Sequence, residues 1–197
     1  MKRFLGVVGI LAVLSALGGA AAAGDVPVEL RRRGIVGQPA PSWQGIESWH
    51  QLPHGKTALD VSEFRGKVVY LYFFQSWCPE CHSRGFPTLA ATRSAFAARN
   101  DVVFLAVQTV FEGFYTNTAA KGLKTLKKFA LDIPMGHDPG PEGSGSRLMK
   151  RYRSGGTPWT VIIDKSGVVR FDGFRLTQPQ ARSLVERLVT SSPGKVQ

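Results

Sequence analysis

The sequence of 197 residues has only two cysteines, Cys78 and Cys81, which stand three positions apart. It also has few histidines, and three of the four, His50, His54 and His137, are scattered along the chain. A structural zinc site needs a second pair of Cys or His ligands at a suitable spacing, and this sequence has no such pair. The scarcity of these residues therefore argues against zinc, and we expect no metal site and no cofactor.

Acidic residues are also few, with 14 Asp and Glu against 25 Lys and Arg, which gives a formal net charge of +11. The basic residues are dispersed, and no combined aromatic and basic motif of a nucleic-acid-binding protein accompanies them. We therefore interpret them as a solvated surface and expect no nucleic-acid partner. Attraction to anionic membranes or acidic proteins remains open.

The first 24 residues have the pattern of a signal peptide. Lys2 and Arg3 precede an uncharged apolar stretch, Phe4–Leu17, and the small residues Ala20–Ala23 suit a cleavage site. The uncharged stretch is also just long enough to span a bilayer, so an uncleaved N-terminal anchor is the alternative, and the only expected membrane contact. No cysteine lies near the cleavage site, which excludes lipoprotein processing. We expect export to the periplasm, an oxidising compartment.

The rest of the chain is long enough for one domain with a full core. Residues 25–56 are rich in Pro, Gly and Trp and show no sustained period, which predicts an N-terminal extension that packs on the domain. We assign residues 57–192 to the domain itself and residues 193–197 to a tail. We find no internal repeat.

Apolar periodicity and turn residues predict an α/β domain, because strand and helix patterns alternate. The continuous apolar run at 67–75 is typical of a central strand that is buried on both faces. The expected strands are 57–59, 67–75, 102–107, a strand ending at Asp164, and 168–171; the expected helices are one turn at 60–63, 82–99 with a kink at Pro87, 121–131, 146–151 and 178–190.

The two cysteines directly follow the central strand, at the predicted start of a helix. This places Cys78 at the helix N-terminus and Cys81 one turn later on the same face, within reach of a disulfide. The free amides and the positive dipole end of the first turn favour a thiolate at Cys78. A nucleophilic thiol with a resolving partner one turn away indicates thiol–disulfide exchange.

Other interpretations of the motif are weaker. A structural disulfide closing so small a loop would stabilise the fold little. The run Cys78–His82 also matches the attachment pattern of c-type haem, with Met135 or Met149 as the axial partner, but it lies at a strand–helix junction in a β/α sequence. A Cu(I)-binding metallochaperone is a further alternative, since thiolates suit Cu(I) and His82 and His137 are available.

Several further motifs accompany the cysteines and together span residues 37–190. They are Gly37–Pro41, Gly66–Val69, Ser76–Cys81, Gly156–Trp159 and Val161–Asp164 followed by Gly167. In combination the sequence resembles the TlpA/ResA-like family of exported thiol–disulfide oxidoreductases, in the thioredoxin superfamily.

The resemblance implies a thioredoxin fold, a central mixed β-sheet flanked by helices. It implies that Cys78 attacks the substrate, that Cys81 resolves the mixed disulfide, and that Pro158 is in the cis form beside them. The main chain of Thr157 would then be free to pair with an extended substrate segment. The implied partners are proteins with thiols or disulfides and a membrane protein that donates electrons.

We expect substrate binding by Trp77, Thr157 and Pro158, and redox tuning by Pro79, Glu80 and His82. The carboxylate of Glu80 should repel the Cys78 thiolate and raise the pKa of that thiol. A less stable thiolate makes the couple more reducing, although His82, Arg84 and the helix dipole oppose this effect. The sequence therefore predicts a periplasmic disulfide reductase.

The sequence also departs from the family pattern near the cysteines. The segment from Cys81 to Pro87 is one residue longer than usual, with Arg84 and Gly85 where an acid is expected. Tyr72 stands where cytoplasmic thioredoxins have a buried acid. The usual proton acceptors are therefore absent, and Glu80 and Glu112 are the nearest candidates.

Overall fold

The computed structural model describes residues 33–141 and 144–191. The predicted signal peptide at 1–24, the start of the extension and the predicted tail at 193–197 lie outside the described residues. Within the described ranges, no helix has both the length and the apolar character needed to cross a membrane.

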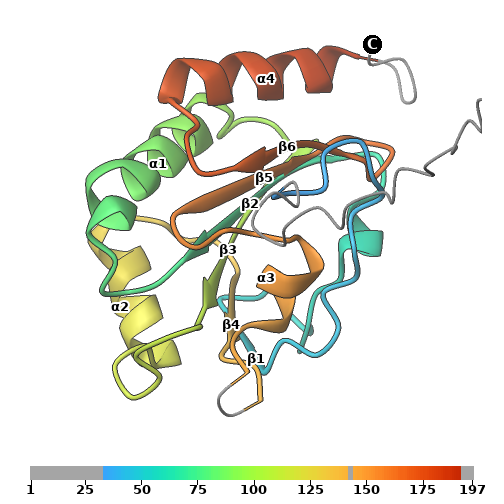
Figure 1. The fold of residues 1–197 in the computed structure, drawn as a ribbon. Coiled ribbons are helices and arrows are strands. Elements are labelled where there is room, and N and C mark those ends of the chain that lie inside the picture. Colours follow the sequence, from blue (N-terminus) through green and yellow to red (C-terminus); the bar gives the residue numbers. More distant parts are fainter. Residues whose placement is uncertain (1–32, 142–143, 192–197) are drawn as a thin grey trace, which may run out of the picture. The chain divides into compact units, whose positions relative to one another are not determined.

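A six-stranded mixed sheet forms the centre of the fold, in the order β1-β4-β3-β2-β5-β6 (Figure 1). The central strand β2 runs parallel to β3 and antiparallel to β5, which confirms the predicted mixed sheet. The strands are β1 Ser48–His50, β2 Val68–Phe74, β3 Val102–Thr109, β4 Met135–Asp138, β5 Trp159–Ile163 and β6 Val169–Gly173.

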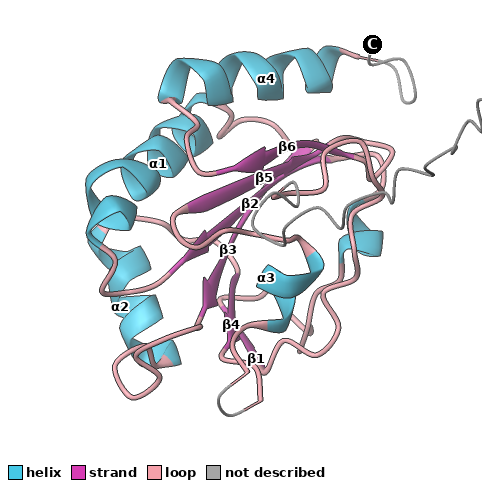
Figure 2. Cartoon of the chain, viewed as in Figure 1, coloured by secondary structure: helices cyan, strands magenta, loops and turns pink. Residues whose placement is uncertain are grey.

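Helices cover both faces of this sheet (Figure 2). The helices α1, α2 and α4 pack on one face, and α3 lies on the other together with the N-terminal extension. The helical elements are the 3₁₀ helix η2 Val61–Phe64, the π-helix η3 Cys81–Gly85, and the α-helices α1 Phe86–Ala95, α2 Ala119–Lys128, α3 Arg147–Arg151 and α4 Gln178–Thr190.

Strand β2 is buried along its whole length, as its apolar run predicts. Alternate side chains enter two separate cores, because successive residues of a strand point to opposite faces. Tyr70 and Tyr72 pack in the core below α1, α2 and α4, whereas Leu71 and Phe73 pack in the core below α3. The position after β2, where the cysteines follow, is thus held by both cores.

The described part of the extension packs on the second core. The Trp43 side chain is fully buried there, and its indole N–H donates to the Tyr152 hydroxyl at 3.0 Å. The extension also contributes the edge strand β1, which pairs with β4 and was not predicted. A strand of three residues is too short to show an alternating pattern.

Two short strand assignments differ from the sequence prediction. Residues 57–59, expected to be a strand, have no regular structure; the chain enters η2 directly through the predicted capping box of Asp60 and Glu63. The Asp60 carboxylate also accepts the main-chain N–H of Trp43 at 2.8 Å, which ties the extension to η2. Strand β4 was missed, because Gly136, His137 and Asp138 do not form an apolar pattern.

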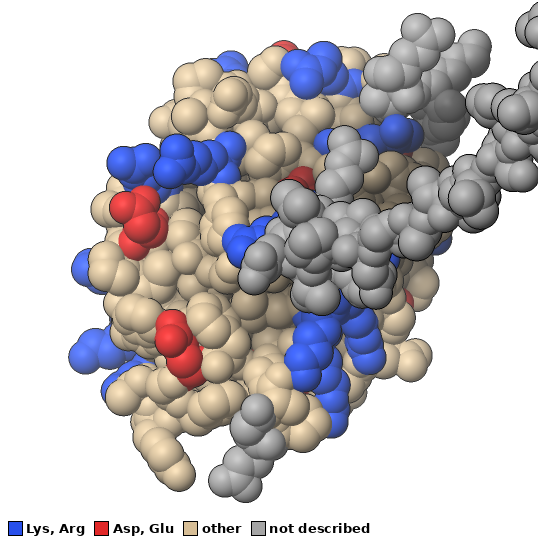
Figure 3. Space-filling view, viewed as in Figure 1, with Lys and Arg blue, Asp and Glu red and all other residues tan. Residues whose placement is uncertain are grey.

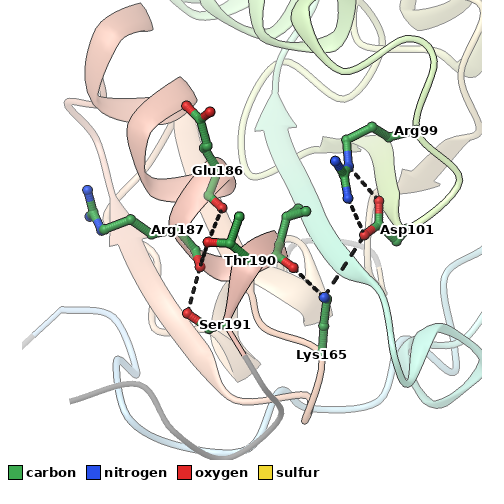
Figure 4. A network of polar contacts seen from close by, with 8 residues as sticks. Arg99, Asp101, Lys165, Glu186, Arg187, Thr190 and Ser191 are labelled. Atoms are coloured by element: carbon green, nitrogen blue, oxygen red, sulfur yellow. Dashed lines mark hydrogen bonds and ion pairs between the residues drawn. The ribbon is translucent and has the colours of Figure 1, made fainter.

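Helix α4 has the predicted bounds, and its C-terminal end is fixed to the β5–β6 turn (Figure 4). The Lys165 ammonium donates to the carbonyl of Val189 and lies 4.0 Å from Asp101, which also pairs with Arg99 at 2.7 Å. A cation at a helix C-terminus interacts favourably with the helix dipole.

Basic side chains lie in separate groups on the face shown in Figure 3, with few acidic ones between them. This distribution agrees with the dispersed basic residues of the sequence.

Candidate functional site

The Cys78–Cys81 pair lies at the junction of β2 with the following helix, as predicted. Helical backbone begins at Pro79, so Cys78 immediately precedes the first turn. Cys78 keeps 6% of its surface exposed, whereas Cys81 is fully buried, and both cysteines are free thiols. Only Cys78 can therefore meet a substrate directly.

Hydrogen bonds stabilise the thiolate of Cys78. The main-chain N–H of Cys81 donates to the Cys78 sulfur at 3.3 Å. The pKa of Cys78 is lowered to about 6, first through the hydrogen bond from the Cys81 thiol and then through the Thr157 side chain and the main-chain N–H groups of Cys81 and Glu80. Burial opposes this shift without reversing it. Cys78 is therefore mainly a thiolate at neutral pH.

Cys81 has the opposite protonation preference. Burial raises its pKa above the ordinary value, and the hydrogen bond that its thiol gives to Cys78 raises it further. Cys81 therefore stays a thiol while Cys78 is a thiolate. The two groups have separate chemical roles: one is ready to attack, and the other first has to lose a proton.

The loop before β5 closes the site from the other side. The Thr157–Pro158 peptide bond is cis, as the resemblance implied. The Cys78 sulfur lies 3.6 Å from the main-chain carbonyl oxygen of Thr157. Trp77, directly before Cys78, is 49% exposed. The three predicted substrate-binding residues, Trp77, Thr157 and Pro158, therefore lie next to Cys78 in sequence or space.

A groove of ≈ 770 Å³ begins at Thr157 and Pro158 and extends to the N-terminus of α4. Its walls come from the first helical turns after Cys78, from the loop before β5 and from the segment before α4. Those walls include Glu80, Ser83, Arg84, Gly85, Thr157, Pro158, Phe174 and Arg175, and Tyr70 and Tyr72 of β2 also line it.

The side chain and the main chain of Glu80 make different contacts near Cys78. Its exposed carboxylate pairs with Arg84 at 3.3 Å, one turn further along the helix. Its main-chain N–H contributes to the lowering of the Cys78 pKa, so the net pKa is below the ordinary value rather than above it. The main-chain N–H groups of the first turn stabilise the thiolate, and the carboxylate is exposed and paired. Repulsion of the thiolate by the Glu80 carboxylate stays a prediction.

His82 and Pro79 have different positions relative to the thiols. The His82 ring is 2.7 Å through Nε2 from the main-chain oxygen of Ser76 and packs near Phe86 and Phe129. Its other ring nitrogen is buried and has no hydrogen-bond partner. Pro79 opens the helix, where the missing N–H of proline costs nothing. Their tuning of the couple stays a prediction.

The extra residue after Cys81 is accommodated by the π-helical segment η3. The N–H of Phe86 donates to the carbonyl of Cys81, five residues earlier, and a regular α-helix follows. Such π-bulges are rare and occur frequently at functional sites. The sequence showed the additional residue but not the bulge that contains it.

A buried amide network supports the turn before Cys78, and sequence reasoning missed it. The Asn117 side chain accepts from the Ser76 N–H at 3.0 Å and donates to the Gln75 side chain at 3.2 Å. These residues are far apart in sequence, and a single Asn in a loop gives no signal of this role. The network fixes the chain between β2 and Cys78.

The residues of the metal and haem alternatives are on other elements. His137 and Met135 lie on β4, where His137 Nδ1 is 3.3 Å from the Gln108 side chain, and Met149 lies on α3. Over residues 33–141 and 144–191, no group of three or more His, Cys, Asp or Glu side chains is arranged to hold a metal ion.

Comparison with protein families places these features in a known group. The model of the family Redoxin matches residues 35–179, which include β1 to β6 and both cysteines. The chain belongs to the Redoxin family. No curated protein matches its sequence.

Solved structures show the same fold. A thioredoxin-like superfamily protein is 30% identical, with a TM-score of 0.70, over 78% of this chain and 97% of that one. A thiol-disulfide isomerase from Corynebacterium glutamicum is 25% identical, with a TM-score of 0.65, over 78% of this chain and 98% of that one. The thioredoxin domain of a thiol-disulfide oxidoreductase from Bacteroides vulgatus is 18% identical, with a TM-score of 0.61, over 79% and 99%, and shows the fold alone.

This Redoxin-family chain is accordingly a thiol–disulfide oxidoreductase with a thioredoxin-like fold, as the resemblance to the TlpA/ResA-like family implied. Membership of this class implies protein thiols as substrates.

Proposed function

We propose that this protein is an exported disulfide reductase that acts on protein disulfides in the periplasm through Cys78 and Cys81. The observation that carries the proposal is the pairing of a Cys78 thiolate with a buried, protonated Cys81 at the end of β2. A thiol whose pKa is close to the ambient pH attacks disulfides most efficiently, because it is ionised and still nucleophilic.

The reaction consists of two exchanges. The Cys78 thiolate attacks one sulfur of the substrate disulfide; a Cys78–substrate disulfide forms, and the other substrate sulfur leaves as a thiolate. Cys81 then loses its proton and attacks the Cys78 sulfur, which closes the Cys78–Cys81 disulfide and releases the second substrate sulfur. The substrate gains two electrons and, with the protons, two thiols. A membrane protein that donates electrons would return the enzyme to the dithiol.

The geometry around Cys78 supports binding of an extended peptide. The Thr157 carbonyl lies beside the attacking sulfur, so a substrate strand that pairs with it would bring its disulfide to Cys78. The exposed Trp77 offers an apolar surface on the other side of the cysteine. The groove from Pro158 to the N-terminus of α4 can hold the substrate residues on one side of the disulfide.

The thiolate itself affects the direction of electron flow only slightly. A pKa of about 6 stabilises the dithiol form at neutral pH and shifts the couple by on the order of 30 mV toward oxidising power. This shift is small compared with the range of thioredoxin-like potentials, so it is compatible with a reductase. The export part of the proposal rests on the signal-peptide pattern of residues 1–24.

Three measurements test the proposal. The dithiol form should reduce insulin-like disulfides, and Cys78→Ser should abolish this activity. Cys81→Ala should trap periplasmic proteins as mixed disulfides on Cys78. Equilibration with glutathione buffers should give a potential more reducing than glutathione. A more oxidising potential, together with oxidation of reduced unfolded proteins, would overturn the reductase direction, and recovery of the protein from the cytoplasm would overturn export.

A further inference from the structure

The second exchange requires Cys81 to lose a proton inside the protein, and neither acid named from the sequence is placed to accept it. The Glu80 carboxylate is on the surface with Arg84. Glu112 is exposed, and its main-chain oxygen, rather than its carboxylate, accepts from Asn117. Among the described residues, no hydrogen bond joins either carboxylate to Cys81.

The side chain that does reach Cys81 is Tyr72. Its hydroxyl lies 3.5 Å from the main-chain oxygen of Cys81, and the residue is fully buried on β2. Its ring packs edge-on against Phe86, with centroids 5.1 Å apart, and stacks with Phe74 at 6.2 Å. These contacts leave the hydroxyl little freedom, so its approach to Cys81 is a fixed feature of the core.

The helix leaves space for this hydroxyl at Gly85. A Cβ atom at Gly85 would overlap the oxygen of Tyr72, although Gly85 has an ordinary helical backbone. Glycine is therefore required here for the space it leaves rather than for its conformational freedom. The π-helical turn, Gly85 and Tyr72 together form a site for a hydroxyl group beside Cys81.

Tyr72 is also close to the outside of the protein, although it is fully buried itself. Tyr72 lines the groove together with Ser83 and Gly85. Its neighbour on the same face of β2 is Tyr70, and Thr160 pairs with Tyr72 across the strands and hydrogen-bonds Tyr70. Tyr72 thus contacts the buried Cys81 and also borders the groove in which the substrate would lie.

We propose that Tyr72 is a catalytic residue of the second exchange and relays the Cys81 proton to the leaving substrate thiolate in the groove. This inference rests on the proposed dithiol function of Cys78 and Cys81. As the Cys81 S–H bond breaks, the Tyr72 oxygen takes that proton and gives its own to the thiolate, directly or through water. The Cys78–Cys81 bond forms while the Cys78–substrate bond breaks, so atoms and electrons balance.

The ionisation preferences agree with a relay rather than with a base. Burial raises the pKa of Tyr72 well above its ordinary value, and nearby Cys81 adds to this effect. A tyrosinate is therefore disfavoured, whereas a neutral hydroxyl can accept one proton and release another without becoming charged. A hydrogen bond between the Tyr72 hydroxyl and the Cys81 side chain, separate from the contact with the main-chain oxygen, lowers the pKa of Cys81 and favours loss of that proton.

Rapid-quench kinetics with a small peptide disulfide test this role, because acid quenching and mass spectrometry follow the mixed disulfide. Tyr72→Phe should leave the first exchange unchanged and slow the second by ~10–100-fold, so that the Cys78–peptide disulfide accumulates. The remaining rate should rise with pH, since hydroxide then removes the proton. The control is Tyr152→Phe, which removes a buried hydroxyl from the core on the other face of the sheet and should change neither step.

The possible outcomes separate this inference from the proposed function. Mixed-disulfide formation with an unchanged second step in Tyr72→Phe, or equal slowing in Tyr152→Phe, would overturn the relay alone. Absence of any Cys78–peptide disulfide in Cys81→Ala, which cannot perform the second exchange, would overturn both proposals. If Tyr72→Phe does not fold, the solvent isotope effect on the second exchange of the unaltered protein decides. Transfer of two protons in one step makes the rate depend on the deuterium fraction along a curve. A linear dependence would contradict the relay.

Discussion

The main-chain N–H of Cys81 donates to the sulfur of Cys78 at 3.3 Å, so the resolving residue also stabilises the attacking one. The Cys81 thiol adds the largest contribution to the low pKa of Cys78. The same contact keeps the proton on Cys81, whose pKa is raised. The same contact thus makes Cys78 the attacking residue and Cys81 the resolving one. Substitution of Cys81 tests this.

We expect Cys81→Ala to raise the pKa of Cys78 from about 6 by ~1 unit, because a hydrogen bond to a charged group is lost. In the unaltered protein, alkylation of Cys78 should slow about tenfold for each pH unit below 6 and level off above it. The pKa is measured from the pH dependence of the alkylation rate or from thiolate absorbance. Cys81→Ser keeps a hydroxyl donor, so the pKa of Cys78 should stay closer to 6 in that variant. An equal rise of the Cys78 pKa in both variants would contradict the assigned cause.

Glu80 offers a second test, because its side chain and its N–H can be removed separately. Glu80→Gln should leave the Cys78 pKa near 6, since the carboxylate is exposed and paired with Arg84. Glu80→Pro should raise the pKa by a few tenths of a unit to ~1 unit, because it deletes an N–H that stabilises the thiolate, at a position where proline is tolerated. A clear fall of the Cys78 pKa in Glu80→Gln would instead show that the carboxylate repels the thiolate.

The sequence was most informative where one physical signal dominates. The apolar run of β2 and the spacing of Cys78 and Cys81 predicted the strand, the helix start and the difference between the two thiols. The capping residues of α4 gave its bounds. Strands β1 and β4 were missed because one is only three residues long and the other has glycine and polar residues in place of an apolar pattern.

The site was harder to predict where it depends on side chains that are distant in sequence. Tyr72 was visible only as a replacement for an acid, and its contact with Gly85 exists because β2 packs against the helix after Cys81. The contribution of the Glu80 main chain was missed, because the sequence does not show that this N–H stabilises the Cys78 thiolate while the carboxylate pairs with Arg84.

The space at Gly85 predicts a specific loss of stability. Gly85→Ala would place a methyl group on the hydroxyl and ring of Tyr72, and overpacking of this kind costs about 1–3 kcal/mol of unfolding free energy. Urea denaturation of the reduced protein measures this loss. In the Tyr72→Phe background the oxygen is absent, so the same alanine substitution should cost less, which a double-mutant cycle detects. Equal costs in both backgrounds would show that the Tyr72 hydroxyl is not the obstacle.

A buried carboxyl of β6 predicts how stability changes with pH. Asp172 accepts the main-chain N–H of Ile35 at 2.7 Å and the indole N–H of Trp159, and burial raises its pKa to about 6. The folded protein therefore holds this proton more tightly than the unfolded chain does. Its contribution to stability is complete below the ordinary pKa of 3.8 and is lost as the pH rises through 6.

Asp172→Asn isolates this contribution, because asparagine keeps an acceptor oxygen and does not titrate. Relative to this variant, the unaltered protein should lose about 1 kcal/mol of unfolding free energy between pH 4 and pH 7, allowing for solvent screening of a half-buried carboxyl. Denaturant unfolding of both proteins at each pH measures the difference, and the exposed Asp132→Asn serves as the control, with no such trend. The difference in unfolding free energy between the two proteins could instead stay constant from pH 4 to pH 7, or change in favour of the unaltered protein. Either result would show that the pKa of Asp172 is not raised in the folded protein.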